Sequence, residues 1–139
     1  MACPYFEPTG LMEPGPWTDY WLHRPRLPLG EAYSGICHAV GGSPQNPPEP
    51  CQREFCNYGY ARGHCEHFPA DSAGDAVRFS VIAAEPVRLV YILEKDHAPA
   101  AYRELSPGEP GLNPVLAAQA AAYAESYRRL AEAKPCTCT

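Results

Sequence analysis

The sequence predicts a small α+β domain with a loop-rich N-terminal half, an antiparallel β-hairpin or small sheet, and a long C-terminal helix. Residues 1–74 hold 11 of the 17 prolines and five of the seven cysteines. Residues 75–139 instead show the hydrophobic periods of strands and then of a helix. A length of 139 residues suits one domain. We therefore expect a single domain, with residues 1–74 as a metal-binding half and residues 75–139 as the hairpin and helix.

The hairpin is predicted from two apolar segments that follow one another closely. Residues 76–83 alternate at first between apolar and polar side chains, and residues 87–93 do likewise. Glu85 and Pro86 lie between them as a tight connection. A lone hairpin is not stable in water, so it has to pack on another element.

The C-terminal helix is that packing partner. Asn113 is a good N-cap, Pro114 suits the first helical position, and residues 115–134 contain no glycine or proline. Pro135 ends the helix. An apolar face follows from the spacing of five side chains, namely Leu116, Ala120, Tyr123, Tyr127 and Leu130.

The N-terminal half shows no sustained hydrophobic period. It reads as loops and turns, with a surface loop at residues 41–48 and one short helical piece at residues 50–56. A half with so little regular structure needs another source of order, and a bound metal supplies one.

Charge and composition narrow the class of protein. The formal net charge is -5 with no basic run, which argues against nucleic-acid binding through phosphate contacts. The longest apolar run, at residues 87–93, is too short to span a bilayer, so we expect no membrane partner.

The opening residues Met1 to Pro4 lack the charged region and the apolar region of a signal peptide, so we expect a cytoplasmic protein. Cysteines in a reducing compartment serve metal binding or redox chemistry more often than disulfides.

Four cysteines are predicted as metal ligands: Cys3, Cys37, Cys56 and Cys65. Cys3 precedes a proline, as the last cysteine of bacterial ferredoxin runs does. Cys37 falls in a predicted small loop at residues 34–38, and Cys56 leads into a glycine-containing turn toward Cys65. Cys51 is the reserve ligand, because on an α-helix it would point about 140° away from Cys56.

Several neighbours are expected to support the ligands. Asn57, with Gly59 and Gly63, suits a turn that aims backbone N–H groups at sulfur. Arg53 and Arg62 are expected to offset the negative charge of four thiolates. Three histidines beside the cysteines are reserve ligands or else surface and supporting residues, namely His38, His64 and His67. An aromatic wall is expected from Tyr5, Phe6, Phe55, Tyr58, Tyr60 and Phe68.

The spacing of the cysteines favours an iron–sulfur cluster, of the 4Fe–4S type, with zinc as the alternative. Structural zinc sites usually show a pair of cysteines two to four residues apart, often twice. Cys51 and Cys56 form one such pair in this half, and no second pair accompanies it. The plainer interpretation is that the cysteines are ordinary buried side chains.

The tail pair Cys136 and Cys138 has two interpretations. It is an exposed pair that is redox-active or accepts a metal, or it is two thiols without a role at a frayed end.

The opening Cys3-Pro4-Tyr5-Phe6 and the segment CNYGYARGHCEHFP at residues 56–69 resemble small bacterial cysteine-rich iron–sulfur or metal-binding proteins. The resemblance covers roughly the first half of the chain. It implies metal binding by Cys3, Cys56 and Cys65 and implies nothing about a substrate.

The sequence thus favours a small iron–sulfur protein in electron transfer or redox sensing, with a redox or protein partner that it does not identify. One alternative is a structural zinc module for protein interaction. A second is a metal-dependent enzyme that uses Glu94, Lys95, Asp96 and His97 as an acid–base group. The plainer interpretation of residues 94–97 is a solvated strand end that limits edge pairing.

Overall fold

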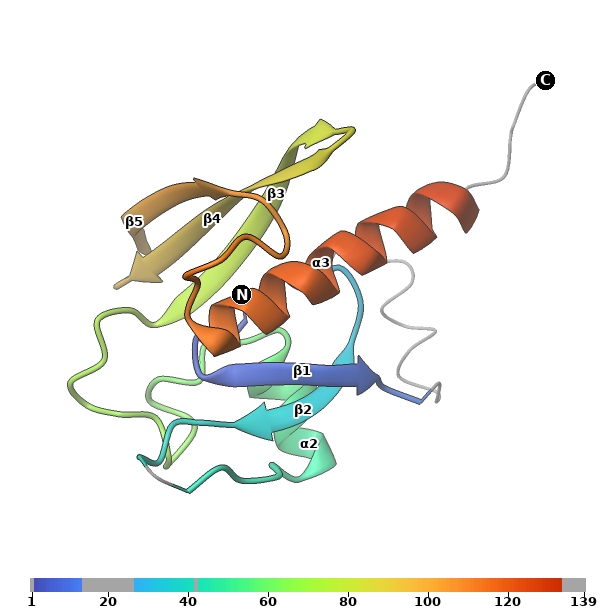
Figure 1. Ribbon diagram of the computed structural model, residues 1–139. Coiled ribbons are helices and arrows are strands. Elements are labelled where there is room, and N and C mark those ends of the chain that lie inside the picture. Colours follow the sequence, from blue (N-terminus) through green and yellow to red (C-terminus); the bar gives the residue numbers. More distant parts are fainter. Residues whose placement is uncertain (1, 14–26, 42, 134–139) are drawn as a thin grey trace.

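The computed structural model describes residues 2–13, 27–41 and 43–133 and has the predicted α+β architecture. Two small antiparallel sheets flank one long helix (Figure 1). The strands are β1 (Phe6–Leu11), β2 (Tyr33–Cys37), β3 (Ala76–Ala84), β4 (Val87–Lys95) and β5 (Ala98–Leu105). The helices are α2 (Glu49–Cys51), the π-helical turn η1 (Gln52–Cys56) and α3 (Pro114–Ala133).

The predicted hairpin is confirmed as β3 and β4, which pair antiparallel with Phe79 opposite Tyr91. Glu85 and Pro86 connect them, as expected. The sheet continues into β5, which pairs with the other side of β4 and forms an edge. Every residue of β5 except Leu105 is exposed, so its sequence lacks the alternation that marks a half-buried strand.

The predicted helix is confirmed as α3, and Asn113 caps it. The Asn113 Oδ1 atom accepts a hydrogen bond of 2.9 Å from the Val115 N–H, which satisfies one of the free donors of the first turn. The predicted apolar face is largely confirmed, since Ala120 and Tyr123 are buried. Leu130 is 40% exposed and lies beyond the core.

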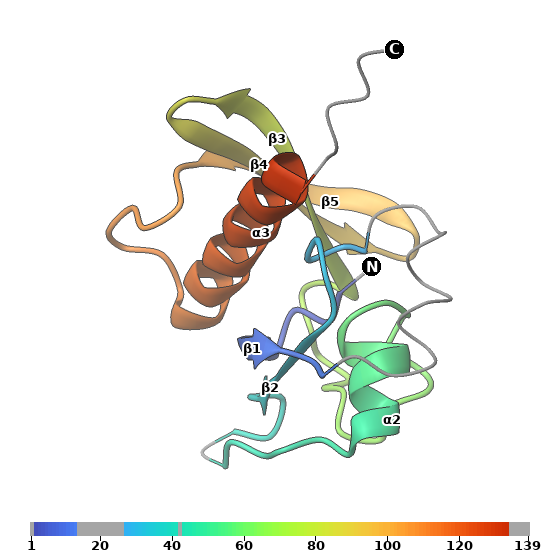
Figure 2. The same cartoon turned by 90° about the vertical axis from the view of Figure 1, so that its right-hand side faces the viewer.

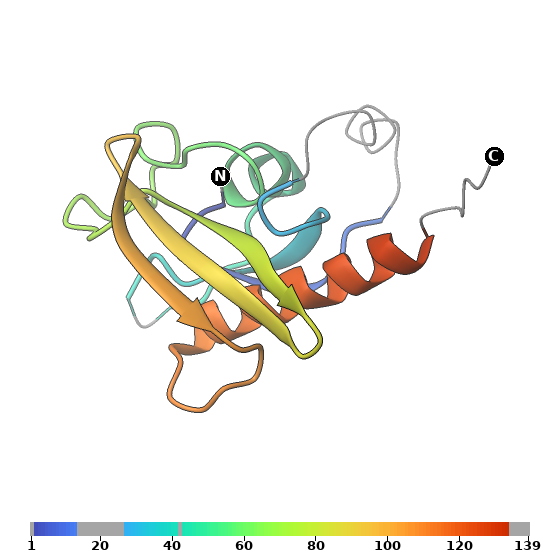
Figure 3. The same ribbon diagram turned by 90° about the horizontal axis from the view of Figure 1, so that it is seen from above.

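Helix α3 lies between the two sheets and joins them into one core (Figure 2). On one side the Tyr123 ring stacks on Phe79 of β3, with ring centroids 5.6 Å apart. On the other side the buried Gln119 side chain donates hydrogen bonds to the carbonyl oxygens of Cys3 and Phe6. Figure 3 shows the three-stranded sheet lying across the helix.

The prediction that the first half consists of loops and turns is wrong at two places, because β1 and β2 form a two-stranded sheet. Their pairing shifts register between Pro8 and Gly10. A proline and glycines within such short strands hide the alternating pattern on which strand prediction depends. Exposed residues in the segment 41–48 agree with the predicted surface loop where the structure describes it.

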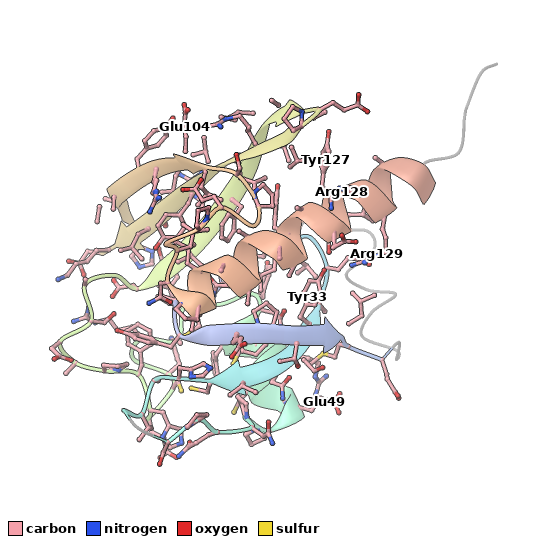
Figure 4. All side chains as sticks on the ribbon, in the orientation of Figure 1. Tyr33, Glu49, Glu104, Tyr127, Arg128 and Arg129 are labelled. Carbon is pink, nitrogen blue, oxygen red and sulfur yellow. The ribbon has the colours of Figure 1, made fainter. Side chains whose placement is uncertain are left out.

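The buried network at the far end of α3 fixes β2 against the helix. The Tyr33 hydroxyl is hydrogen-bonded to Ser126 and accepts a bond of 2.9 Å from Arg129, which also pairs with Glu31. Figure 4 labels Tyr33 and Arg129. Within the described residues, no helix combines the length and the apolar character that crossing a bilayer requires.

Candidate metal centre

Cys3 and Cys56 lie side by side although they are far apart in the sequence. The Cys3 N–H donates a hydrogen bond of 3.0 Å to the Cys56 carbonyl oxygen. The neighbouring Ala2 exchanges two backbone hydrogen bonds with Val77 of β3. Both cysteines are buried within the core. Ala2 and Cys3 are therefore held between β3 and η1.

Cys37 reaches the same region as the last residue of β2. The prediction that it lies in a loop is wrong: it pairs with Phe6 of β1 and exchanges two backbone hydrogen bonds with Gln45. The next residue, His38, donates its N–H to the Tyr5 carbonyl oxygen at 2.9 Å. The Cys37 Sγ atom accepts a hydrogen bond from the Ala39 N–H at 3.4 Å. Such N–H groups stabilise a thiolate.

Aromatic contacts link the segment that carries Cys65 to the segments that carry Cys3 and Cys56. Phe55, beside Cys56, stacks on His64 with ring centroids 5.8 Å apart. Phe68 meets Tyr5 edge to face at 5.6 Å, and its N–H donates to the Cys65 carbonyl oxygen. The segment that carries Cys65 is therefore packed against those that carry Cys3 and Cys56.

The surroundings of Cys3 and Cys56 favour the protonated form of their thiols. Burial raises the pKa of the Cys3 thiol to about 12 despite backbone hydrogen bonds that lower it, and Cys37 and Cys65 add to the increase. Burial likewise raises the pKa of Cys56, followed by the effects of Cys3, Cys37, Cys65 and Cys51 in that order. Without a metal, Cys3 and Cys56 are thus neutral thiols at pH 7. A metal that binds them has to displace their protons.

In the described part of the chain, no group of three or more His, Cys, Asp or Glu side chains is drawn together tightly enough to hold one ion. All five cysteines of the first half are free thiols.

The reason for placing Cys51 last among the ligands does not hold. The argument assumed an α-helix from residue 50 to residue 56, whereas residues 52–56 form a π-helical turn. The Asn57 N–H bonds to the Gln52 carbonyl oxygen, and the Gly59 N–H bonds to that of Glu54, each five residues back. A helix with this wider bonding winds by a smaller angle per residue than an α-helix does. The angle of about 140° between Cys51 and Cys56, which assumed an α-helix throughout, therefore does not apply.

The Asn57 side chain bonds to backbone groups of two elements. Its side chain is fully buried and bridges η1 to β2. The Oδ1 atom accepts the Tyr33 N–H at 2.9 Å, and Nδ2 donates to the carbonyl oxygens of Tyr33 and Gln52, each at 2.8 Å. Asn57 thus fixes the turn that ends in Cys56 against the strand that ends in Cys37.

The two arginines are engaged by carboxylates. Arg62 Nη1 donates to Asp75 Oδ1 at 2.7 Å, and Arg53 lies 3.8 Å from Glu49. The positive charge of Arg62 therefore compensates the negative charge of the buried Asp75 before that of any thiolate.

Each of the three histidines has a neighbour of its own. His38 Nε2 lies 2.7 Å from Glu7 Oε1, and His67 lies 3.6 Å from Glu66. His64 stacks on Phe55, as described above. These contacts agree with supporting or surface positions.

Glu94 belongs to a buried network rather than to a solvated strand end, so that interpretation is wrong for this residue. Its side chain is 9% exposed. It accepts hydrogen bonds from Tyr60 at 2.7 Å and from Arg78 at 2.9 Å. Burial and the Glu94 carboxylate raise the pKa of Tyr60 to about 12, so Tyr60 remains a donor at neutral pH. The His97 ring lies 4.4 Å from the Tyr60 ring.

This network is a feature that sequence reasoning missed. Tyr60 and Arg62 lie between Cys56 and Cys65, and they bond to Glu94 of β4 and to Asp75 just before β3. The partners are 34 and 13 residues apart, so no local pattern reveals them. The network attaches the segment between two predicted ligands to the three-stranded sheet.

Cys136 and Cys138 lie outside the described residues. No protein-family model, curated protein or solved structure matches the chain.

Proposed function

We propose that this protein holds an iron–sulfur cluster of the 4Fe–4S type on Cys3, Cys37, Cys56 and Cys65, and that it acts in electron transfer or redox sensing. The observation that carries the proposal is that direct contacts link the four separate segments that carry these cysteines. Backbone bonding joins Cys3 to Cys56. Strand pairing brings in Cys37, and aromatic packing brings in Cys65.

The surroundings of the thiols suit a cluster. Phe55, Phe68 and Tyr5 pack against the core beside them and limit the access of water. The Ala39 N–H already points at the sulfur of Cys37. Burial and hydrogen bonds to sulfur are two of the means by which a protein sets the reduction potential of a cluster.

A bound cluster would supply one-electron chemistry, and the residues of the chain would hold and shield it. Asn57 fixes the turn before the loop to Cys65, and Tyr60 and Arg62 fix that loop to the sheet. These hydrogen bonds anchor the loop from Cys56 to Cys65 to β2 and to the three-stranded sheet. An anchored loop suits electron transfer, because little has to move when the charge changes.

Optical spectroscopy tests the identity of the centre. We expect protein purified without oxygen to be brown, with a broad visible absorption that dithionite bleaches. A colourless protein that contains zinc in a fixed ratio to the chain would instead support the zinc-binding interaction module.

Substitution tests the ligands. Changing Cys56 or Cys65 to Ser should remove the metal and much of the stability together, because site formation and folding are coupled. Cys138→Ser is the matched control and should do neither. If all three variants bind metal and unfold like the wild type, the ligand assignment is wrong.

A further inference from the structure

Strand β5 is exposed on both faces and along one edge. Every residue from Ala98 to Glu104 is exposed, and only Leu105 is buried. Because the side chains of a strand alternate between its faces, α3 covers neither face of β5 before Leu105. β5 is the outermost strand of its sheet (Figure 1), and no described strand or bridge pairs with the edge that faces away from β4. A row of backbone N–H and C=O groups is therefore available to another strand.

The features that usually protect an exposed edge are weak in β5. Soluble proteins protect such edges with charges, prolines, bulges or a short strand. β5 is eight residues long, and its one proline, Pro99, is only the second residue. The middle of the strand, residues 100–102, carries no charge. Tyr102 is 64% exposed, more than any other large apolar side chain that the structure describes.

The two charges of β5 are paired within the chain. Arg103 lies 2.8 Å from Glu109, and Glu104 lies 3.7 Å from Arg88. The net charge of -5 is therefore not concentrated on this strand. A second copy of the strand can approach it without the like-charge repulsion that excludes many partners.

We propose that a second copy of this chain occupies the edge: two β5 strands pair antiparallel about a two-fold axis at Tyr102 and join two three-stranded sheets into one continuous sheet. An antiparallel edge is complementary to itself, and its two-fold symmetry closes the assembly at a dimer. The inference is independent of the proposed function, because it uses none of the cysteines.

Charge and ring packing select the axis. Directly opposite residues of an antiparallel pair lie on the same face, so the axis passes through one residue that faces its own copy. An axis at Arg103 or at Glu104 would oppose like charges, which is destabilising. An axis at Ala101 avoids this but leaves Tyr102 opposite Ala100. An axis at Tyr102 opposes both charged residues to alanines and brings the two aromatic rings together, which is a favourable cross-strand pair.

Sedimentation equilibrium of the full-length protein, purified without oxygen and kept with a thiol reductant, tests the proposal. We expect the wild type to show a reversible equilibrium between monomer and dimer. Tyr102→Lys and Tyr102→Glu each place like charges opposite one another and should raise the dissociation constant at least about tenfold. An equimolar mixture of the two variants should dimerise again, because opposite charges then face each other.

Ile82→Lys is the matched control. Ile82 is 48% exposed on β3, at the other side of the sheet, so this variant should dimerise like the wild type. Far-UV circular dichroism checks that all variants are folded. In the wild type, amide hydrogen exchange of residues 99–105 should slow as the protein concentration rises.

Three results would overturn the inference. A wild type that stays monomeric up to about 1 mM would exclude the dimer, even if an unrelated extended peptide binds along β5. Equal weakening by Ile82→Lys would place the contact on a face of the sheet rather than on its edge. A mixture of the two Tyr102 variants that stays monomeric would exclude the two-fold pairing at this residue.

Discussion

Replacing Asn57 by Ala is expected to destabilise the protein strongly, because this one side chain satisfies buried backbone groups of two elements. The substitution takes a partner from the N–H and from the carbonyl oxygen of Tyr33, which is 5% exposed. The Gln52 carbonyl oxygen keeps its bond from the Asn57 N–H at 3.0 Å. Two buried groups therefore lose their partner, at about 1–3 kcal/mol each.

The expected loss is thus about 4 kcal/mol, a large part of the ~5–15 kcal/mol that stabilises a typical domain. Urea unfolding followed by far-UV circular dichroism measures it, with the slope m as a check on two-state behaviour. Asn46→Ala is the matched control, because Asn46 is exposed. A loss below about 1 kcal/mol for Asn57→Ala would refute the bridging role.

Two further predictions concern Asp75 and Gly30. Desolvation opposes ionisation of Asp75, but hydrogen bonds from the Asp96 N–H and from Arg62 outweigh it and lower its pKa. A lowered pKa contributes stability above the unfolded value near 3.9, and that contribution is lost as pH falls through the folded value. Asp75→Asn should therefore cost about 2 kcal/mol at pH 7, and progressively less as pH falls below about 4, which urea titrations at a series of pH values measure. An equal cost at every pH would contradict the role of the charge. Gly30→Ala should cost about 2 kcal/mol or more, because the added Cβ would lie 2.5 Å from the Cβ of Ser126 and the backbone φ of Gly30 is +89°. Thermal unfolding measures the loss. Gly41→Ala is the control: its added Cβ meets nothing within 4 Å, so the variant should be as stable as the wild type.

The second half of the chain could be predicted because its secondary structure depends on residues that are close together in the sequence. Helix α3 has a cap, a strong composition of helix formers and an apolar face, and β3 and β4 follow each other across two residues. Strand β5 was missed because it is an exposed edge whose side chains need not alternate. Its turn begins at Asp96 and His97, which take left-handed φ values of 52° and 63° without a glycine to announce them.

The first half could be predicted less well, because its order comes from contacts between distant residues. Strand β1 pairs with β2 across the intervening segment, and the pairing is interrupted at Pro8. A π-helical turn at Gln52–Cys56 has no sequence signature that separates it from an α-helix. The cysteines could be recognised by number and density, but the bonds that bring Cys3 to Cys56 could not.

In the candidate site, too, the sequence predicted which residues matter but not which partners they bind. Asn57 was expected to matter as a turn residue near sulfur, and its role is instead to bridge η1 and β2. Arg62 was expected to balance thiolate charge, and it pairs with a buried carboxylate that follows it by 13 residues. Sequence therefore identifies the chemically active residue types, while the partner of each is fixed by tertiary packing.

The central claim is the proposal that Cys3, Cys37, Cys56 and Cys65 hold an iron–sulfur cluster. Elemental analysis for iron, zinc and inorganic sulfide, on full-length protein purified without oxygen, tests it most directly. We expect iron and inorganic sulfide in equal amounts and in a fixed ratio to the chain, and little zinc. Stoichiometric zinc without sulfide, or no bound metal at all, would contradict it.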